Sequence, residues 1–152
     1  MTYTAQMLDT YPAQINMDTK HLAEAIDRLI ACSQACTACA DACLSEGPEA
    51  LPRLTRCIRD NLDCADICDT TARVLSRHTG YDANLTRAQV QAAVQALKTC
   101  GDSCAEHRDA HEHCRVCEQA CRDTEQVVNA VLPQLQPSGA APAEPSQAAP
   151  QT

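Results

Sequence analysis

The sequence contains no phenylalanine or tryptophan, three tyrosines and four glycines in its 152 residues. Aromatic side chains are enriched in β-strands, so their scarcity disfavours sheets and aromatic packing. Alanine, leucine, glutamine, arginine and glutamate are plentiful instead, and these residues favour helices. We therefore expect an all-α protein.

Positive charge is also scarce. Twelve Lys and Arg residues face 20 Asp and Glu residues, which gives a formal net charge of −8. Nucleic-acid binding depends on clustered Lys and Arg, so we expect no nucleic-acid partner. No run reaches the roughly eighteen apolar residues of a membrane span, and the N-terminal MTYTAQMLDTYPAQ lacks the features of a secretory signal. We expect no membrane association and a cytoplasmic location.

Cysteine is abundant, with twelve residues. In a reducing compartment we expect thiols or metal ligands rather than disulfides. The segment CSQACTACADAC, residues 32–43, repeats cysteine at steps of four, three and four. At about 100° per residue, these four thiols lie on one stripe of a helix. The complete set is Cys32, Cys36, Cys39, Cys43, Cys57, Cys64, Cys68, Cys100, Cys104, Cys114, Cys117 and Cys121.

Capping residues and helix breakers divide the chain into four long helices. The expected helices run from Asp18 to Ser45 or Glu46, from Pro48 or Glu49 to His78, from Asn84 or Thr86 to about His107, and from about His111 to Leu132. A short helix in residues 3–10 belongs to an N-terminal extension, residues 1–17. Residues 18–133 form the bundle. Residues 134–152 are rich in Pro, Ala and Gln and predict a disordered tail.

The residue type on the inward-facing stripe changes along every helix. The first and third helices run from aliphatic residues to cysteines, and the second and fourth run from cysteines to aliphatic residues. Short loops favour an antiparallel up-down-up-down four-helix bundle, which brings all of the cysteines into one half. The pattern therefore predicts a thiol-lined compartment at one end of the bundle.

Several chemistries could account for a thiol compartment. Buried cysteine can act as a small hydrophobic residue, and disulfides could join neighbouring helices. Zinc takes four ligands in closed sites, and three such sites would leave excess negative charge in the core. Iron-sulfur clusters are usually held by a loop, which this sequence lacks. Zinc, iron-sulfur and disulfide-stapled structural proteins remain alternatives.

Cu(I) suits the compartment better. It is soft, prefers thiolate and accepts two or three ligands, so that one sulfur can bridge two ions. One univalent ion per thiolate also neutralises the core. The expected load is on the order of a dozen ions per chain, which suits storage.

Three histidines join the predicted metal ligands. His107 and His111 continue the thiol stripes at the end where the third and fourth helices meet, and His113 precedes Cys114. A neutral imidazole can receive Cu(I) from a donor and pass it inward. Catalysis is not expected, because the sequence has no phosphate-binding glycine loop, no nucleophile paired with an isolated base and no inward carboxylate pair.

The CxxxC and CxxC steps, with CIRDNLDCADIC (57–68) and HEHCRVCEQAC (111–121), resemble the cytosolic bacterial copper storage proteins over about residues 18–132. The resemblance implies a bundle that holds many Cu(I) ions against copper toxicity, assembled as a homotetramer, with a copper chaperone as a candidate donor. Richer members line nearly the whole bundle with cysteine. Here other residues take inward positions and predict a reduced capacity: Asn61, Thr71, Val90, Ala93, Leu97, Thr124 and Val128.

Overall fold

The computed structural model describes residues 1–135, which form helices, turns and loops without a β-strand. The elements are α1 (Tyr3–Asp9), α2 (Thr19–Leu44), α3 (Leu51–Leu75), α4 (Ala83–Ala105), α5 (Glu112–Val131) and the 3-10 turn η1 (Leu132–Gln134). Within this part of the chain, no helix combines the length and the apolar character needed to cross a membrane. The predicted all-α class is confirmed.

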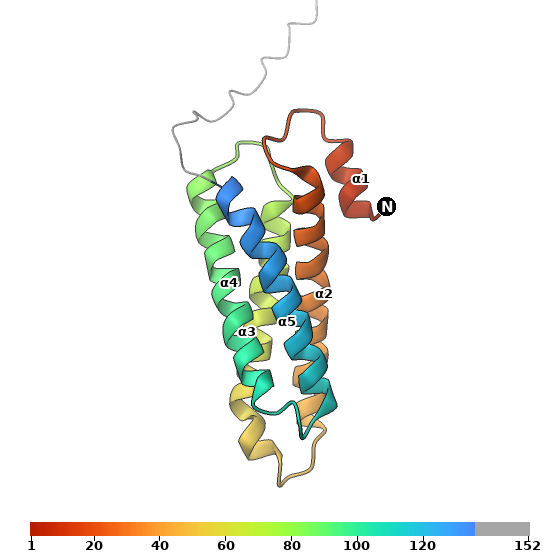
Figure 1. Cartoon of the computed structure of the whole chain (residues 1–152), viewed down its shortest axis with the longest axis vertical. Helices are drawn as coiled ribbons and strands as arrows, with labels where there is room; N and C mark the ends of the chain where they lie inside the picture. Colours follow the sequence, from red (N-terminus) through yellow and green to blue (C-terminus); the bar gives the residue numbers. More distant parts are fainter. Residues whose placement is uncertain (136–152) are drawn as a thin grey trace, which may run out of the picture.

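The four long helices lie side by side and alternate in direction (Figure 1). Helices α2 and α4 each pack against both α3 and α5, so the four surround one core. The α2–α3 and α4–α5 loops lie together at the lower end in Figure 1, and the α3–α4 loop lies at the upper end. The predicted antiparallel four-helix bundle is confirmed, and the short α1 packs beside the first turns of α2.

The start of α2 follows the predicted capping chemistry. The Asp18 carboxylate accepts hydrogen bonds from the backbone N–H groups of Lys20 and His21, at 3.0 and 3.2 Å. These N–H groups have no partner within the helix, so the side chain satisfies them. Asp18 therefore fixes where α2 begins.

The connection between α3 and α4 differs from the expectation. Helix α3 ends at Leu75, three residues before the predicted His78. Helix α4 is capped by Asp82, whose carboxylate accepts from the N–H groups two and three residues further on. The predicted starts, Asn84 and Thr86, therefore lie inside the first turn, because the earlier acid supplies the cap. The other ends of the long helices lie within three residues of the prediction.

One half of the core is aliphatic. It contains Leu22 and Leu29 of α2, Leu75 of α3, Leu97 of α4 and Val128 of α5, and each of these side chains is at most 2% exposed. Full burial of such a side chain contributes about 1.5–3 kcal/mol to folding. The half nearer the α3–α4 loop therefore holds the four helices together without metal.

The bundle extends past the predicted boundary at residue 133. The side-chain oxygen of Gln134 accepts a hydrogen bond of 2.8 Å from the backbone N–H of Asp18, and Leu135 is fully buried. The predicted tail, residues 134–152, is therefore wrong for its first two residues, because an apolar side chain and an amide dock after Pro133. The rest of that prediction, residues 136–152, lies outside the described residues.

Replacing Leu97 by Ala should lower the free energy of unfolding of the reduced, metal-free protein by about 2–5 kcal/mol, because the change leaves a cavity in a tightly packed core. Leu85→Ala is the matched control, since Leu85 lies on the same helix and is 65% exposed. Its effect should stay within about 0.5 kcal/mol. Urea denaturation followed by circular dichroism measures both. Equal stability of the two variants would show that the aliphatic half does not hold the bundle.

Candidate metal centre

All twelve cysteines lie in the half of the bundle next to the α2–α3 and α4–α5 loops. Each is at most 3% exposed, and each is a free thiol. They come from the second half of α2, the middle of α3, the end of α4 and the first part of α5. The antiparallel order thus gathers the four thiol stripes, as the sequence pattern predicts.

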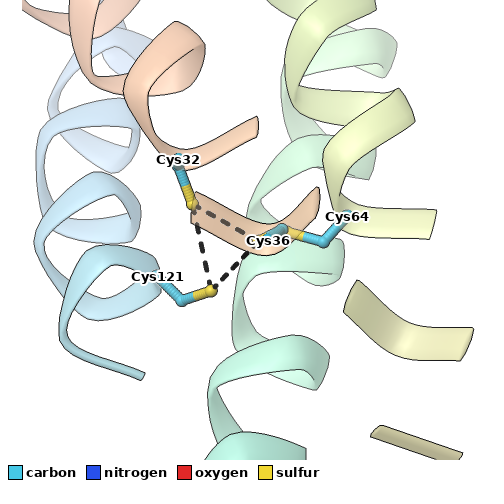
Figure 2. Close-up of side chains that lie close together, drawn as sticks. All are labelled: Cys32, Cys36, Cys64 and Cys121. Atoms are coloured by element: carbon cyan, nitrogen blue, oxygen red, sulfur yellow. Dashed lines mark hydrogen bonds between the residues drawn. The ribbon is translucent and has the colours of Figure 1, made fainter. Parts of the chain in front are cut away.

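The sulfur atoms are spaced as metal ligands would be. The Sγ atoms of Cys32, Cys36 and Cys121 form a triangle with sides of 3.8, 3.9 and 3.8 Å, and Cys64 points toward the same space from α3 (Figure 2). The centre of such a triangle lies about 2.2 Å from each sulfur, close to the metal–thiolate bond length of about 2.3 Å known for zinc. A disulfide needs about 2.05 Å between sulfurs, so these thiols are not paired.

The ligand groups overlap from the middle of the bundle to its end. Each of the following groups keeps its ligating atoms within 4.8 Å of one another and shares at least one residue with the next. They are Cys32, Cys36, Cys64 and Cys121; Cys36, Cys100, Cys117 and Cys121; Cys39, Cys104 and Cys117; Cys39, Cys43, His113 and Cys114; and Glu46, His111 and His113. We call this series the ligand ladder.

Two cysteines lie beside the ladder. The Sγ atom of Cys57 is 3.8 Å from that of Cys104, and the Sγ atom of Cys68 is 3.8 Å from that of Cys64. Both sulfurs are therefore close enough to share an ion with a member of the ladder. The structure thus brings every predicted cysteine into one continuous array.

The array has no buried positive charge to balance thiolates. The buried polar residues of the described chain are one asparagine and three threonines, and none is charged. Burial raises the pKa of the Cys43 thiol to about 12. Where no cation lies nearby, desolvation favours the protonated form of a buried thiol, and protonated thiols pack as small apolar groups. Only incoming metal ions can compensate the charge when these protons leave.

Asn61 lies among the thiols. Its Oδ1 accepts hydrogen bonds from Cys117 Sγ at 2.9 Å and from Cys100 Sγ at 3.4 Å. Its Nδ2 donates to the backbone oxygen of Cys57 at 2.8 Å and to Cys104 Sγ at 3.5 Å. The sequence predicted its inward position but not these partners. Since Nδ2 also donates to Cys57 Sγ at 3.3 Å, the amide orients thiols of three helices while it occupies space that a further thiol would take.

Of the three predicted histidines, His113 reaches the thiols. Its Nδ1 lies 3.6 Å from the Sγ atoms of Cys39 and Cys114 and 4.0 Å from that of Cys43. His111 stacks on it with ring centroids 5.5 Å apart. His107 lies in the turn after α4 and enters none of the ligand groups found in residues 1–135. Its role as a ligand stays a prediction.

Sequence reasoning missed Glu46, which joins the two histidines. Its Oε1 lies 2.9 Å from His113 Nε2 and 3.0 Å from His111 Nδ1. The hydrogen bond with His113 is the main cause that lowers the pKa of the Glu46 carboxyl. Glu46 lies on the α2–α3 loop, outside any helical stripe, so spacing carried no signal for it. Its place in a loop at the thiol end was the only hint.

Comparison with known proteins identifies the family. The family model described as "Copper storage protein" matches residues 18–133, which span the four-helix bundle. The chain belongs to the copper storage protein family. The resemblance expected from the cysteine motifs is thereby confirmed, and the family is one of storage rather than catalysis.

Solved copper storage proteins share this fold. The copper storage protein Ccsp of Streptomyces lividans, loaded with 10 copper equivalents, is 53% identical, with a TM-score of 0.83 over 86% of this chain and 98% of that chain. A structure described as copper loading to a cytosolic copper storage protein from Streptomyces lividans, with five coppers, is 56% identical, with a TM-score of 0.72 over 75% and 93% of the two chains. The uncharacterised cysteine-rich protein YhjQ of Bacillus subtilis is 30% identical over 62% of this chain and 81% of its own length.

Replacing Asn61 by Ala should destabilise the reduced, metal-free copper storage protein by about 1–3 kcal/mol, because buried hydrogen-bonding groups lose their partner. Asn129→Ala is the control, since Asn129 is an exposed asparagine of α5. Its effect should stay within about 0.5 kcal/mol. Chemical denaturation followed by circular dichroism measures both variants. If the two unfold at the same denaturant concentration, the amide does not organise the thiols.

Proposed function

We propose that this protein stores Cu(I) in the cytoplasm and so protects the cell from copper toxicity. The observation that carries the proposal is the single buried array of twelve thiols, without a buried cation beside it in the described chain. Membership of the copper storage family supports it. The copper carried by the Streptomyces lividans proteins, one of them described as cytosolic, supports it as well.

The chemistry of loading follows from burial. Each arriving Cu(I) forms bonds to sulfur while a thiol proton leaves, so that the charge of the core stays close to neutral. Sulfur atoms shared between neighbouring groups can bridge two ions, which suits the low coordination number of Cu(I). Zinc would bring two charges per ion and would need four sulfurs for each closed site. The array therefore favours univalent copper.

The proposed ligands are the twelve cysteines and His113, with His111 and His107 at the loop end as transient contacts. The ladder connects His111, His113 and ten of the cysteines in sequence, so an ion can move from the histidines to the deepest thiols by exchanging one ligand at a time. The next sulfur can donate a lone pair to the Cu(I) ion before the previous ligand leaves, so no step requires a bare ion. A copper chaperone would deliver ions at the histidine end.

We also propose that the protein assembles as a homotetramer. Tyr3 and Met7 on α1 are 86% and 70% exposed. Burying such side chains against neighbouring protomers would stabilise an assembly. Light scattering of the purified protein measures its mass in solution.

Anaerobic titration of the reduced protein with Cu(I), in competition with a chromophoric chelator, tests the storage function. We expect uptake of on the order of a dozen ions per chain, since each thiol can neutralise one ion. Protein with alkylated thiols is the control and should take up little copper. Saturation at one to four ions would exclude storage and favour a discrete metal site.

Replacing Cys36, Cys64, Cys104 and Cys117 together by Ala should remove at least the share of copper that these thiols hold, and more where they bridge ions. Helicity should persist, because the aliphatic half remains and alanine favours helices. Copper titration and far-ultraviolet circular dichroism measure the two effects. Thr37→Ala, on the exposed face of α2, is the control for substitution itself. Global unfolding of the fourfold variant, or unchanged capacity, would contradict the assignment.

A further inference from the structure

The Glu46 carboxylate links the two histidines through one oxygen atom. Its Oε1 lies within hydrogen-bond distance of His113 Nε2 and of His111 Nδ1, at 2.9 and 3.0 Å. The imidazole rings are stacked at an angle of 27°. The side chains of His111, His113 and Glu46 are 15%, 25% and 31% exposed, so solvent competes only partly for these bonds. The arrangement uses a different nitrogen of each ring.

This difference assigns the protons. An ionised carboxylate accepts hydrogen bonds and cannot donate them, so His113 Nε2, which is hydrogen-bonded to it, carries hydrogen. His111 Nδ1 faces the same oxygen at 3.0 Å, where a lone pair would be repelled, so this nitrogen carries hydrogen as well. A neutral imidazole carries one N–H, which leaves the other nitrogen with a free lone pair. His113 is then protonated at Nε2 and free at Nδ1, whereas His111 is protonated at Nδ1 and free at Nε2. One carboxylate therefore imposes opposite tautomers on two adjacent histidines.

The free nitrogen of His113 is the one that faces the thiols. Its Nδ1 lies 3.6 Å from the sulfurs of Cys39 and Cys114 and 4.0 Å from that of Cys43. A histidine binds metal through its unprotonated nitrogen, and a carboxylate that accepts from the other nitrogen fixes the ring and raises its basicity. The Glu46 carboxylate stands in that outer position, on the side of the ring away from the thiols.

We propose that Glu46 is a positioning residue for copper uptake, which holds His113 with Nδ1 free toward the thiols and holds His111 as the Nδ1–H tautomer. The copper part of this inference rests on the proposed storage function, whereas the tautomer part does not. Without the carboxylate, the His113 ring can rotate and can present a protonated nitrogen to the thiols. His111 returns to the Nε2–H form, which free histidine prefers.

Long-range proton–nitrogen NMR of the reduced, metal-free protein distinguishes the tautomers directly. The measurement is made at about pH 8, where free histidine, with a pKa of about 6.5, is neutral. We expect Nδ1–H at His111 and Nε2–H at His113 in the wild type. His111 is the sharper reporter, because its assigned form is the one that free histidine disfavours. Observation of Nε2–H at His111 in the wild type would overturn the proposal.

Three variants separate positioning from general structural damage. Glu46→Ala should convert His111 mainly to Nε2–H. Glu46→Gln keeps a side-chain oxygen that can accept from both rings and should largely restore the wild-type tautomers. Glu49→Ala removes an exposed carboxylate from the same loop, outside the ligand ladder, and should change neither histidine. Wild-type tautomers in Glu46→Ala would contradict the inference.

Copper competition measures the consequence for binding. Loss of an outer carboxylate partner typically weakens a metal site by about 10–100-fold, and we expect a loss of that size for the ion bound near His113 in Glu46→Ala. In a His113→Ala background the same change should have little further effect, because Glu46 acts through that ring. Equal losses in both backgrounds would overturn the positioning role.

The two proposals fail separately. If wild-type protein saturates at one to four copper ions, the storage function is wrong, whereas the tautomers measured without metal still support the assignment of Glu46. If copper uptake reaches the expected dozen but His111 carries its proton on Nε2, the positioning role is wrong and storage stands.

Discussion

The core of this protein is governed by charge balance in a dry interior. A thiolate buried without a nearby cation is strongly unfavourable, and the described core contains no Lys, Arg or His⁺ to accompany twelve of them. The metal-free protein meets this constraint when the thiols keep their protons, because desolvation disfavours the charged form. The loaded protein can meet this constraint only if the bound metal ions bring as many positive charges as the thiols lose in protons. The same constraint explains why the fold must not depend on metal: neutral thiols and aliphatic side chains both pack as apolar groups, so one bundle can serve both states.

Much of this design can be predicted from the sequence, because helical periodicity decides which residues share a face. The steps of four and three place Cys32, Cys36 and Cys39 on one stripe, and antiparallel order then brings the stripes of α2 and α5 together. Helix ends were predictable where a single side chain controls them, as Asp18 does. They were missed where two candidates compete, as at the start of α4, where Asp82 supplies the cap ahead of Asn84.

The remaining features depend on contacts that periodicity does not encode. Glu46 lies on a loop, where the direction of a side chain is set by the backbone path rather than by a repeat. Asn61 was placed on the inward stripe, but its four cysteine partners depend on the orientation of the amide. Leu135 follows Pro133 and precedes the Pro-rich residues that favoured disorder, yet its apolar side chain is fully buried against the bundle. In each case one specific contact decides the position of a side chain, and neither periodicity nor the composition of the segment predicts that contact.

The two-part core also determines where copper can exchange. At the aliphatic end, fully buried residues such as Leu97 and Val128 fill the interior, and they offer no ligand to a soft cation. At the thiol end, His113 is a quarter exposed and touches both the sulfurs and Glu46. Uptake and release therefore share one end of a closed compartment.

Because neighbouring ligand groups overlap, an ion at this end can move deeper only when the next sulfurs are free or can be shared. The ability of thiolate to bridge two Cu(I) ions is thus required for filling as well as for charge balance, since a closed four-ligand site near the histidines would block those behind it.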